Sequence, residues 1–332
     1  MVNNKTILIT GGTGSFGRKF TEVVFKRYKP KKVIVLSRDE FKQSEMKKVF
    51  HPSKYPIRYF LGDVRDRYRL HRAFEDVDYV IHAAALKQVP ALEYNPTEAV
   101  KTNVDGANNI VNAAIDAGVE KVVALSTDKA VNPVNLYGAT KLVSEKIFIS
   151  GNAYAGGKVN FSIVRYGNVV GSRGSVVPLF LKLKSEGVKK FPITDERMTR
   201  FWVTLEQGTS LVFRALQDAE GGEIFVPKIP SMRIVDLARA IKPDCEFKFV
   251  GIRPGEKVHE TLVSGDEART TKDVEGVYVI LPHFLDGGLR GSYKEYPFVD
   301  GDFVYRSDTN DKWVTTENLT EMVNQLDVAP RA

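Results

Sequence analysis

The sequence has little cysteine and few histidines. Its 332 residues include a single cysteine, Cys245, so no intrachain disulfide framework exists and a reducing compartment is favoured. We interpret Cys245 as a packing residue. We expect no metal, because metal-ligand spacing is missing among the five histidines, His51, His71, His82, His259 and His283.

Long apolar runs and long runs of one charge are also missing. No apolar run approaches the roughly 20 residues that span a bilayer, and the first residues lack the features of a signal peptide. We therefore expect a cytoplasmic protein with no membrane partner. The net charge of +7 arises from 48 basic and 41 acidic residues that are scattered along the chain. Nucleic acid is not an expected partner, whereas a modest positive excess fits an enzyme whose ligands carry phosphates.

A glycine-rich turn follows the first predicted strand, a β-branched run at residues 7–10, and a helix is predicted from about Phe16. Its glycines allow a tight turn, close approach of a pyrophosphate and close contact between helix and strand. A second strand at residues 33–36 lies near the interval expected for a dinucleotide site, which we favour over a plain glycine turn. The cofactor residues expected in the turn are Gly11, Thr13, Gly14, Ser15, Phe16 and Gly17.

The second strand ends in Ser37 and Arg38, where an acidic residue would bind the ribose 2′-hydroxyl of NAD. Ser37, Arg38 and Lys42 can all donate to a 2′-phosphate, so NADP is favoured over NAD. An alternative stays open, in which Ser37 and Glu40 form a capping box for a helix that starts near Asp39 and Arg38 is merely solvated.

Further strands are predicted at residues 57–61, 78–82, 121–126 and 161–166, in alternation with helices. This order predicts an α/β fold with a doubly wound parallel sheet that binds ligands at the carboxyl ends of its strands. Asp63 is expected either to bond an adenine amine or to cap the next helix, and the small Ala83 allows a cofactor to lie against the backbone. Lys87 faces the same crevice. Apolar spacing over residues 97–117 predicts a helix with Val100 and Val104 in the core.

The stretch at residues 125–141 combines hydroxyl groups, a carboxylate, amines and a Tyr-x-x-x-Lys pattern after the fifth strand. On a helix, Tyr137 and Lys141 share one face, so we expect Lys141 and the nicotinamide charge to lower the pKa of Tyr137 for oxidation of a substrate hydroxyl. Asp128 and Lys129 are not needed for that reaction. They suggest acid and base chemistry on neighbouring substrate atoms.

At these residues the chain resembles an extended short-chain dehydrogenase/reductase, and within that superfamily it is similar to the inverting UDP-N-acetylglucosamine 4,6-dehydratases. Retaining dehydratases that act on dTDP-glucose carry Asp-Glu where this chain has Asp128-Lys129. Because the chain keeps Tyr137, it is more similar to the branch that opens pseudaminic acid synthesis than to the capsule-type branch. The motifs that carry the resemblance lie at residues 10–17, 37–40, 62–66, 82–87, 126–130, 137–141, 165–178, 193–195, 198–201 and 251–257.

The resemblance implies roles for individual residues, with NADP as cofactor, UDP-N-acetylglucosamine as partner and a homo-oligomeric assembly. The implied catalytic residues are Thr127, Asp128, Lys129, Tyr137 and Lys141. The implied cofactor residues are those of the glycine turn with Ser37, Arg38, Asp39, Glu40, Lys42, Asp63, Val64, Ala83, Thr102, Tyr137 and Lys141. The implied substrate residues are Lys87, Asn168, Val176, Val177, Thr194, Arg253 and Glu256.

The expected reaction is oxidation at C4, loss of water across C5 and C6, and return of hydride to C6 with inversion at C5. In it Lys129, neutral if burial and Lys141 depress its pKa, removes the C5 proton, and Asp128 protonates the departing hydroxyl. Because the two residues are adjacent, only a loop conformation could point both at one sugar ring. Two alternatives are a UDP-sugar C4-epimerase, which needs no such pair, and a non-catalytic NADP-sensing binding protein.

The second half of the chain is expected to form a smaller nucleotide-sugar-binding domain at residues 171–332. The NADP-binding Rossmann domain would cover residues 1–170 and take in part of 199–222. Helices are predicted at 180–186, 205–216, 231–241 and 316–326, and residues 264–312 are expected to be irregular.

Overall fold

A nine-stranded sheet forms the centre of the molecule. The computed structural model describes residues 1–171, 175–283 and 291–328. Neighbouring strands pair in parallel from β10 through β3, and β15 and β14 add an antiparallel edge. This confirms the predicted α/β class with a parallel-dominated sheet. In spatial order the strands are β14 (Thr271–Val274), β15 (Val277–Ile280), β10 (Ile224–Pro227), β6 (Asn160–Tyr166), β5 (Lys121–Thr127), β4 (Tyr79–His82), β1 (Thr6–Thr10), β2 (Lys32–Ser37) and β3 (Ile57–Leu61).

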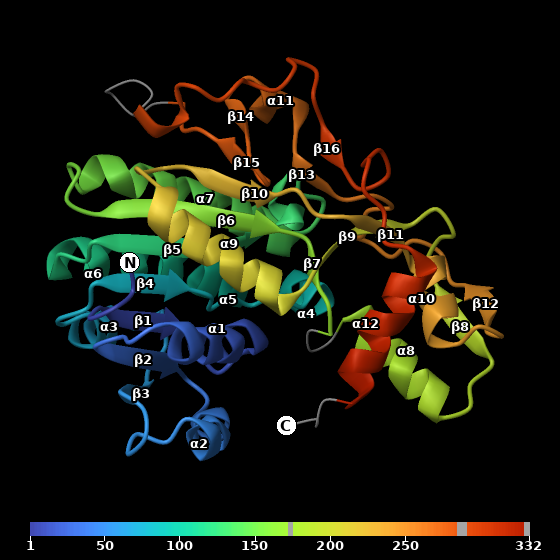
Figure 1. Ribbon diagram of the computed structural model, residues 1–332, viewed down its shortest axis with the longest axis horizontal. Helices are drawn as coiled ribbons and strands as arrows, with labels where there is room; N and C mark the ends of the chain where they lie inside the picture. Colours follow the sequence, from blue (N-terminus) through green and yellow to red (C-terminus); the bar gives the residue numbers. More distant parts are fainter. Residues whose placement is uncertain (172–174, 284–290, 329–332) are drawn as a thin grey trace.

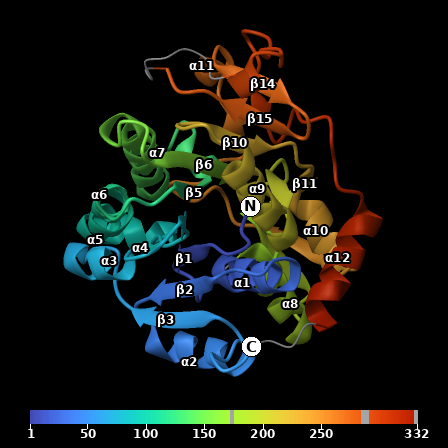
Figure 2. The ribbon, with the colours of Figure 1, turned by 60° about the vertical axis from the view of Figure 1, so that its left-hand side comes forward.

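Helices cover both faces of this sheet, as Figure 2 shows. One face carries α3 (Arg67–Ala73), α4 (Val89–Tyr94), α5 (Pro96–Val100), α6 (Gly106–Ala117) and α7 (Leu136–Tyr154). The other carries α1 (Ser15–Arg27) and α9 (Leu205–Asp218), and α2 (Glu40–Val49) lies near the β3 edge.

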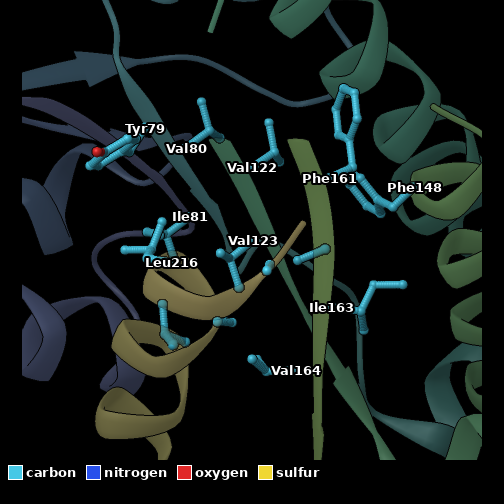
Figure 3. Close-up of a cluster of buried hydrophobic side chains, with 14 of the residues drawn as sticks. Tyr79, Val80, Ile81, Val122, Val123, Phe148, Phe161, Ile163, Val164 and Leu216 are labelled. Atoms are coloured by element: carbon cyan, nitrogen blue, oxygen red, sulfur yellow. The ribbon is translucent and has the colours of Figure 1, made fainter. Parts of the chain in front are cut away.

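The central strands are mostly apolar and buried, since helices exclude water from both faces of the sheet. Strands β1 and β4 are fully buried. Figure 3 shows the resulting layer, in which side chains of β4, β5 and β6 lie with Phe148 of α7 and Leu216 of α9. The continuous apolar runs in the sequence are therefore strands of a doubly covered sheet.

The long helix expected at residues 97–117 contains a π-helical turn, η1 (Lys101–Asp105), between α5 and α6. The wider turn rotates the helix face, so Thr102 and Asn103 are buried while Val100 is 40% exposed and Val104 is partly exposed. The prediction that Val100 and Val104 are core residues is therefore wrong. The buried Asn103 side chain accepts from the Leu86 amide and donates to the Leu86 carbonyl and the Thr140 hydroxyl, which fixes the loop after β4.

A second, smaller apolar cluster lies beside the end of the sheet toward which the β6 arrow points (Figure 1). The C-terminal helix packs there with Leu319 and Val323 buried, as its spacing predicted. Cys245 also packs against this cluster, as expected. The elements of this region are β7 (Asn168–Val169), α8 (Val176–Ser185), β8 (Lys190–Ile193), β9 (Thr199–Val203), β11 (Ser231–Arg233), α10 (Ile234–Ile241), β12 (Glu246–Phe249) and α12 (Thr316–Val328).

Two details differ from the sequence predictions. The helix expected at 231–241 begins only at Ile234, after β11. Residues 264–312, expected to be irregular, contain β14 and β15 of the central sheet with α11 (Gly265–Ala268), η3 (Gly291–Tyr293) and β16 (Tyr305–Arg306), which pairs with β13 (Thr261–Val263). The glycine-rich segment after β6 is described in part, because residues 172–174 lie outside the described residues. Within the described residues no helix is long and apolar enough to cross a membrane.

One buried arginine joins β6 to three other elements. Arg165 is 1% exposed and donates to both carboxylate oxygens of Glu145 on α7, at 3.0 and 2.7 Å. It also donates to both oxygens of Glu267 on α11, at 3.0 and 2.9 Å, and to the carbonyl of Leu262 on β13. A buried guanidinium with two bidentate carboxylates is satisfied only while all of these elements stay in place.

The substitution Arg165→Met should lower the free energy of unfolding by about 3–5 kcal/mol, because it leaves two carboxylates buried without their cation. Equilibrium urea unfolding followed by circular dichroism measures this loss. The control Arg58→Met, on an exposed position of β3, should stay within about 0.5 kcal/mol of the wild type. Equal losses in the two variants would show that Arg165 does not hold these elements together.

Candidate active site

A cavity of about 730 Å³ opens at the carboxyl ends of the parallel strands. Its walls include the residues that follow β1, β2, β4, β5 and β6 in the chain. This is where the strand order places ligands in an open α/β sheet. The predicted residues that line it are Gly11, Thr13, Gly14, Ser15, Phe16, Gly17, Ser37, Arg38, Asp39, Lys42, Asp63, Val64, Ala83, Lys87, Thr102, Thr127, Lys129, Tyr137, Lys141 and Asn168.

Several predicted residues lie outside these walls. Asp128 is fully buried behind Lys129, and Glu40 is exposed in the first turn of α2. Arg253 and Glu256 form an ion pair at 3.5 Å in the turn between β12 and β13. The others are Val176 and Val177, which start α8, and Thr194, which follows β8.

The glycine turn leaves no room for side chains. Gly11 has a φ of 63°, and a Cβ there would lie 2.9 Å from the backbone of Ala84. A Cβ on Gly17 would lie 2.5 Å from the backbone of Gly12. The β1–α1 turn therefore packs directly against the segment after β4, and the backbone amides at the start of α1 stay open to an anion.

The end of β2 is organised by hydroxyl groups and by Asp39. Ser37 Oγ lies 2.9 Å from Thr13 Oγ1 and accepts from the backbone N–H of Asp39. The cap of α2 is Asp39, which accepts from the Lys42 amide, so the predicted capping box of Ser37 and Glu40 is wrong. Arg38 is more than half exposed at the cavity wall, where its guanidinium lies 3.6 Å from Asp63.

Asp63 does not cap the following helix, because the cap of α3 is Asp66. Its carboxylate accepts instead from the backbone and guanidinium of Arg65. Since Asp63 also lines the cavity, a ligand amine can reach it from the cavity side.

The Asp128–Lys129 pair lies in a short 3₁₀ turn, η2 (Asp128–Ala130), directly after β5. Thr127 caps this turn, and its hydroxyl donates to Asp128 Oδ1 at 2.9 Å. Lys129 Nζ donates to the same oxygen at 2.9 Å. The turn brings the two functional groups into contact with each other, with Lys129 lining the cavity and Asp128 buried.

The charges around this turn differ from the sequence expectation. Burial lowers the pKa of Lys129, but the nearby charges of Asp128 and Glu260 outweigh burial and leave that pKa raised. The expected depression of the Lys129 pKa is therefore wrong, and Lys129 carries its proton in this structure. The Lys129 ammonium group is held between two carboxylates, since Nζ lies 2.9 Å from Asp128 and 3.3 Å from Glu260.

Tyr137 and Lys141 lie on the first turns of α7, as predicted. Burial raises the pKa of the Tyr137 phenol, and the opposing effects come from Lys129 and from a hydrogen bond with Thr127. Lys141 is not among the groups that act on this pKa, whereas the expected effect of the nicotinamide charge stays a prediction. Burial lowers the pKa of Lys141 to about 8, against the opposing charge of Glu145.

Sequence reasoning missed Glu260 and Arg200, which lie behind Lys129. Glu260 is 2% exposed, and its Oε1 lies 3.3 Å from Lys129 Nζ and 3.7 Å from Arg200 Nε. Arg200 lies within the motif at residues 198–201 but was given no role, and Glu260 has no local pattern that marks it, because each reaches the site only through the tertiary fold. Within the described ranges, no group of three or more His, Cys, Asp or Glu side chains is arranged to hold a metal.

Gly138 allows α7 to approach the 3₁₀ turn. A Cβ at this position would lie 2.1 Å from the carbonyl oxygen of Lys129 and 3.0 Å from Pro133 Cβ. The Tyr137 and Lys129 side chains can share one wall of the cavity because the residue between these segments has no side chain.

Comparisons with known proteins agree with this architecture. Residues 7–282 match the family model described as polysaccharide biosynthesis protein. The chain is 52% identical to an inverting UDP-N-acetylglucosamine 4,6-dehydratase of Campylobacter jejuni over 98% of this chain and 99% of that protein. It is 40% identical to a UDP-glucose 4-epimerase of Rickettsia massiliae, over 98% and 97% of the two chains. A solved structure, Pen from Bacillus thuringiensis, superposes with a TM-score of 0.89 at 37% identity and covers 98% of this chain and 99% of that chain.

The substitution Gly138→Ala should lower the free energy of unfolding by about 1–3 kcal/mol, because the methyl group forces α7 and the Lys129 backbone apart. Thermal or urea unfolding measures the change. The matched control is Gly208→Ala in α9, where the nearest atom to the new Cβ would lie 3.9 Å away and no loss is expected. A Gly138→Ala variant as stable as Gly208→Ala would contradict the close contact.

Proposed function

The chain belongs to the polysaccharide biosynthesis protein family, and on that premise we propose that it is an NADP-dependent, inverting UDP-N-acetylglucosamine 4,6-dehydratase. The observation that carries the proposal is the 2.9 Å contact between Lys129, which lines the cavity with Tyr137, and the fully buried Asp128. Oxidation at C4 alone needs only Tyr137 and Lys141. A buried carboxylate joined to a lysine adds the acid and the base that an elimination requires.

The cavity fits a nicotinamide dinucleotide. The glycine turn with its amides facing outward suits a pyrophosphate, and the missing Cβ atoms of Gly11 and Gly17 allow the close backbone packing that such a site needs. Ser37, Arg38 and Lys42 at the end of β2 would hold a 2′-phosphate. When bound, the oxidised nicotinamide would accept hydride from C4, add positive charge near Tyr137 and return hydride to C6.

Tyr137 would take the proton of the C4 hydroxyl. Its phenol is neutral in this structure because burial raises its pKa, so a phenolate depends on positive charge nearby. Lys129 and Lys141 supply such charge from η2 and from the next turn of α7. Thr127 hydrogen-bonds both Tyr137 and Asp128, and it thereby connects the oxidation step to the elimination step.

Elimination needs Lys129 neutral and Asp128 protonated. Transfer of one proton along the 2.9 Å hydrogen bond from Lys129 Nζ to Asp128 Oδ1 creates both states at once. The Nζ lone pair then takes the C5 proton, the C5–H electrons form the C5=C6 bond, and the C6 hydroxyl leaves as water with the proton of Asp128. With hydride returned to C6 by the bound cofactor, a proton delivered to C5 by water from the face opposite Lys129 would give the 4-keto-6-deoxy-L-hexose.

The remaining predicted residues would hold the nucleotide sugar. Lys87 and Asn168 line the cavity beside Lys129, and Arg253 with Glu256 would bind the diphosphate and ribose from the turn before β13. Val176, Val177 and Thr194 would contact the uridine side. A cytoplasmic location and a homo-oligomeric assembly stay predictions from the sequence.

Incubation of the protein with UDP-N-acetylglucosamine in deuterated water, followed by proton NMR, tests the function. We expect a new C6 methyl signal and deuterium at C5. A galacto-configured product without a methyl would instead indicate the epimerase, and no turnover of any UDP-sugar would indicate a binding protein. Lys129→Ala should reduce C5 exchange by about 10²–10⁴-fold and leave NADP binding unchanged. The control Lys158→Ala, at an exposed position after α7, should behave as wild type.

The cofactor preference is tested by Arg38→Ala. Loss of a charged donor to a 2′-phosphate should weaken NADP binding by about tenfold or more and leave NAD binding unchanged. Calorimetric titration of each dinucleotide measures both constants, with Arg27→Ala on the exposed end of α1 as the control. An equal loss for NAD and NADP would contradict the proposed 2′-phosphate contact.

A further inference from the structure

Glu260 is a buried carboxylate that reaches the Asp128–Lys129 pair from the far part of the chain. It directly precedes β13, and its Oε1 lies 3.3 Å from Lys129 Nζ. Lys129 Nζ therefore lies between two carboxylates, one from its own turn and one from the C-terminal part of the chain. The proposed function uses only the first.

The Glu260 backbone and its cationic neighbour are both held rigidly. Glu260 N–H donates to Ser307 Oγ, and its carbonyl accepts from the Ser307 amide, each at 2.9 Å. Arg200 donates from its terminal nitrogens to the carbonyls of Thr199, Val258 and Lys257, which leaves Nε facing Glu260 at 3.7 Å. With its backbone bonded to Ser307 and Arg200 beside its carboxylate, Glu260 can hold Lys129 Nζ in one position.

The free oxygens of the two carboxylates are informative. Among the described residues, Asp128 Oδ2 and Glu260 Oε2 are buried and have no hydrogen-bond partner. Each carboxylate thus contacts Lys129 through one oxygen and keeps the other unpaired, an unfavourable state that a purely structural ion pair would avoid. Such a state is typical of groups that change their protonation or their partner during a reaction.

We propose that Glu260 is a positioning residue for the elimination step: it holds Lys129 Nζ against Asp128 Oδ1 and controls how readily the proton passes from Lys129 to Asp128. The transfer breaks one N–H bond and forms one O–H bond, and no other bond changes. The proposal rests on the proposed dehydration. It adds a residue that touches neither the glycine turn nor the Tyr-x-x-x-Lys pattern.

The sign of the effect follows from the charges that face Lys129. The negative charge of Glu260 stabilises the ammonium form and so restrains the transfer, while Arg200 offsets part of that charge. Without Glu260 the ammonium loses one of its two carboxylates, so it should lose its proton at lower pH. The charged and titratable groups near Lys129 are Asp128, Tyr137, Lys87, Arg200, Lys257 and Glu260.

The test compares Glu260→Gln and Glu260→Ala in single-turnover reactions with UDP-N-acetylglucosamine. Reduced-nicotinamide absorbance follows C4 oxidation, and the C6 methyl signal follows elimination. In Glu260→Ala, Lys129 Nζ is no longer held against Asp128, a loss that outweighs the easier proton transfer. Oxidation should therefore stay within about twofold of wild type while elimination slows about tenfold or more, so reduced nicotinamide accumulates. In Glu260→Gln, whose amide oxygen still accepts from Lys129, elimination should fall less. The high-pH limb of the pH–rate profile for elimination in Glu260→Gln should move down by about one pH unit, because Lys129 loses the nearby negative charge of Glu260.

The controls separate this proposal from its premise. Glu275→Gln, in the exposed turn between β14 and β15, should match the wild type in both steps. No methyl product from the wild type would refute the dehydratase function itself. If the wild type forms the methyl product, equal slowing of both steps, a higher KM at unchanged kcat, or an unshifted pH limb in Glu260→Gln would each overturn the role of Glu260.

Discussion

The buried guanidinium of Arg165 is the constraint on which the site depends. It ties β6 of the central sheet to Glu145 on α7 and to Glu267 and the Leu262 carbonyl in the C-terminal part of the chain. Glu145 in turn accepts from Ser126, two residues before Asp128, and its charge acts on Lys141. Leu262 lies two residues after Glu260 in the chain. One arginine therefore positions the segments that carry Asp128, Lys141 and Glu260 relative to one another.

Coulomb interactions outweigh burial at Lys129, whereas burial outweighs them at Lys141. Lys129 has two carboxylates within 3.3 Å, which raise its pKa in spite of burial. Lys141 has the charge of Glu145 nearby, but that carboxylate is already bonded to Arg165, and the pKa of Lys141 falls to about 8. Two lysines in one cavity thus hold their protons with different strength: Lys129 holds its proton more firmly, and Lys141 gives up its proton more easily.

The parts of the site that could be predicted from sequence are those built from neighbouring residues. The glycine turn, the strand and helix alternation and the Tyr137–Lys141 spacing are local, so residue types and periodicity were enough to place them at one edge of the sheet. The π turn at Lys101–Asp105 could not be read from apolar spacing, because it breaks the helical period without a proline or glycine. The pKa of Lys129 was mispredicted because the charge of Asp128 and that of Glu260, which comes from a distant segment, together outweigh burial. The pKa of Tyr137 is raised by burial, which no local pattern identifies.

The two parts of the chain meet at the reacting groups themselves. Lys257 Nζ donates to the carbonyl of Val131, and Asn135, the cap of α7, donates to the carbonyl of Gly255. These bonds fasten the segment that carries Arg253, Glu256 and Glu260 to the turn that carries Asp128 and Lys129. The same bonds therefore keep Glu260 and Lys129 in a fixed arrangement across the two parts of the chain.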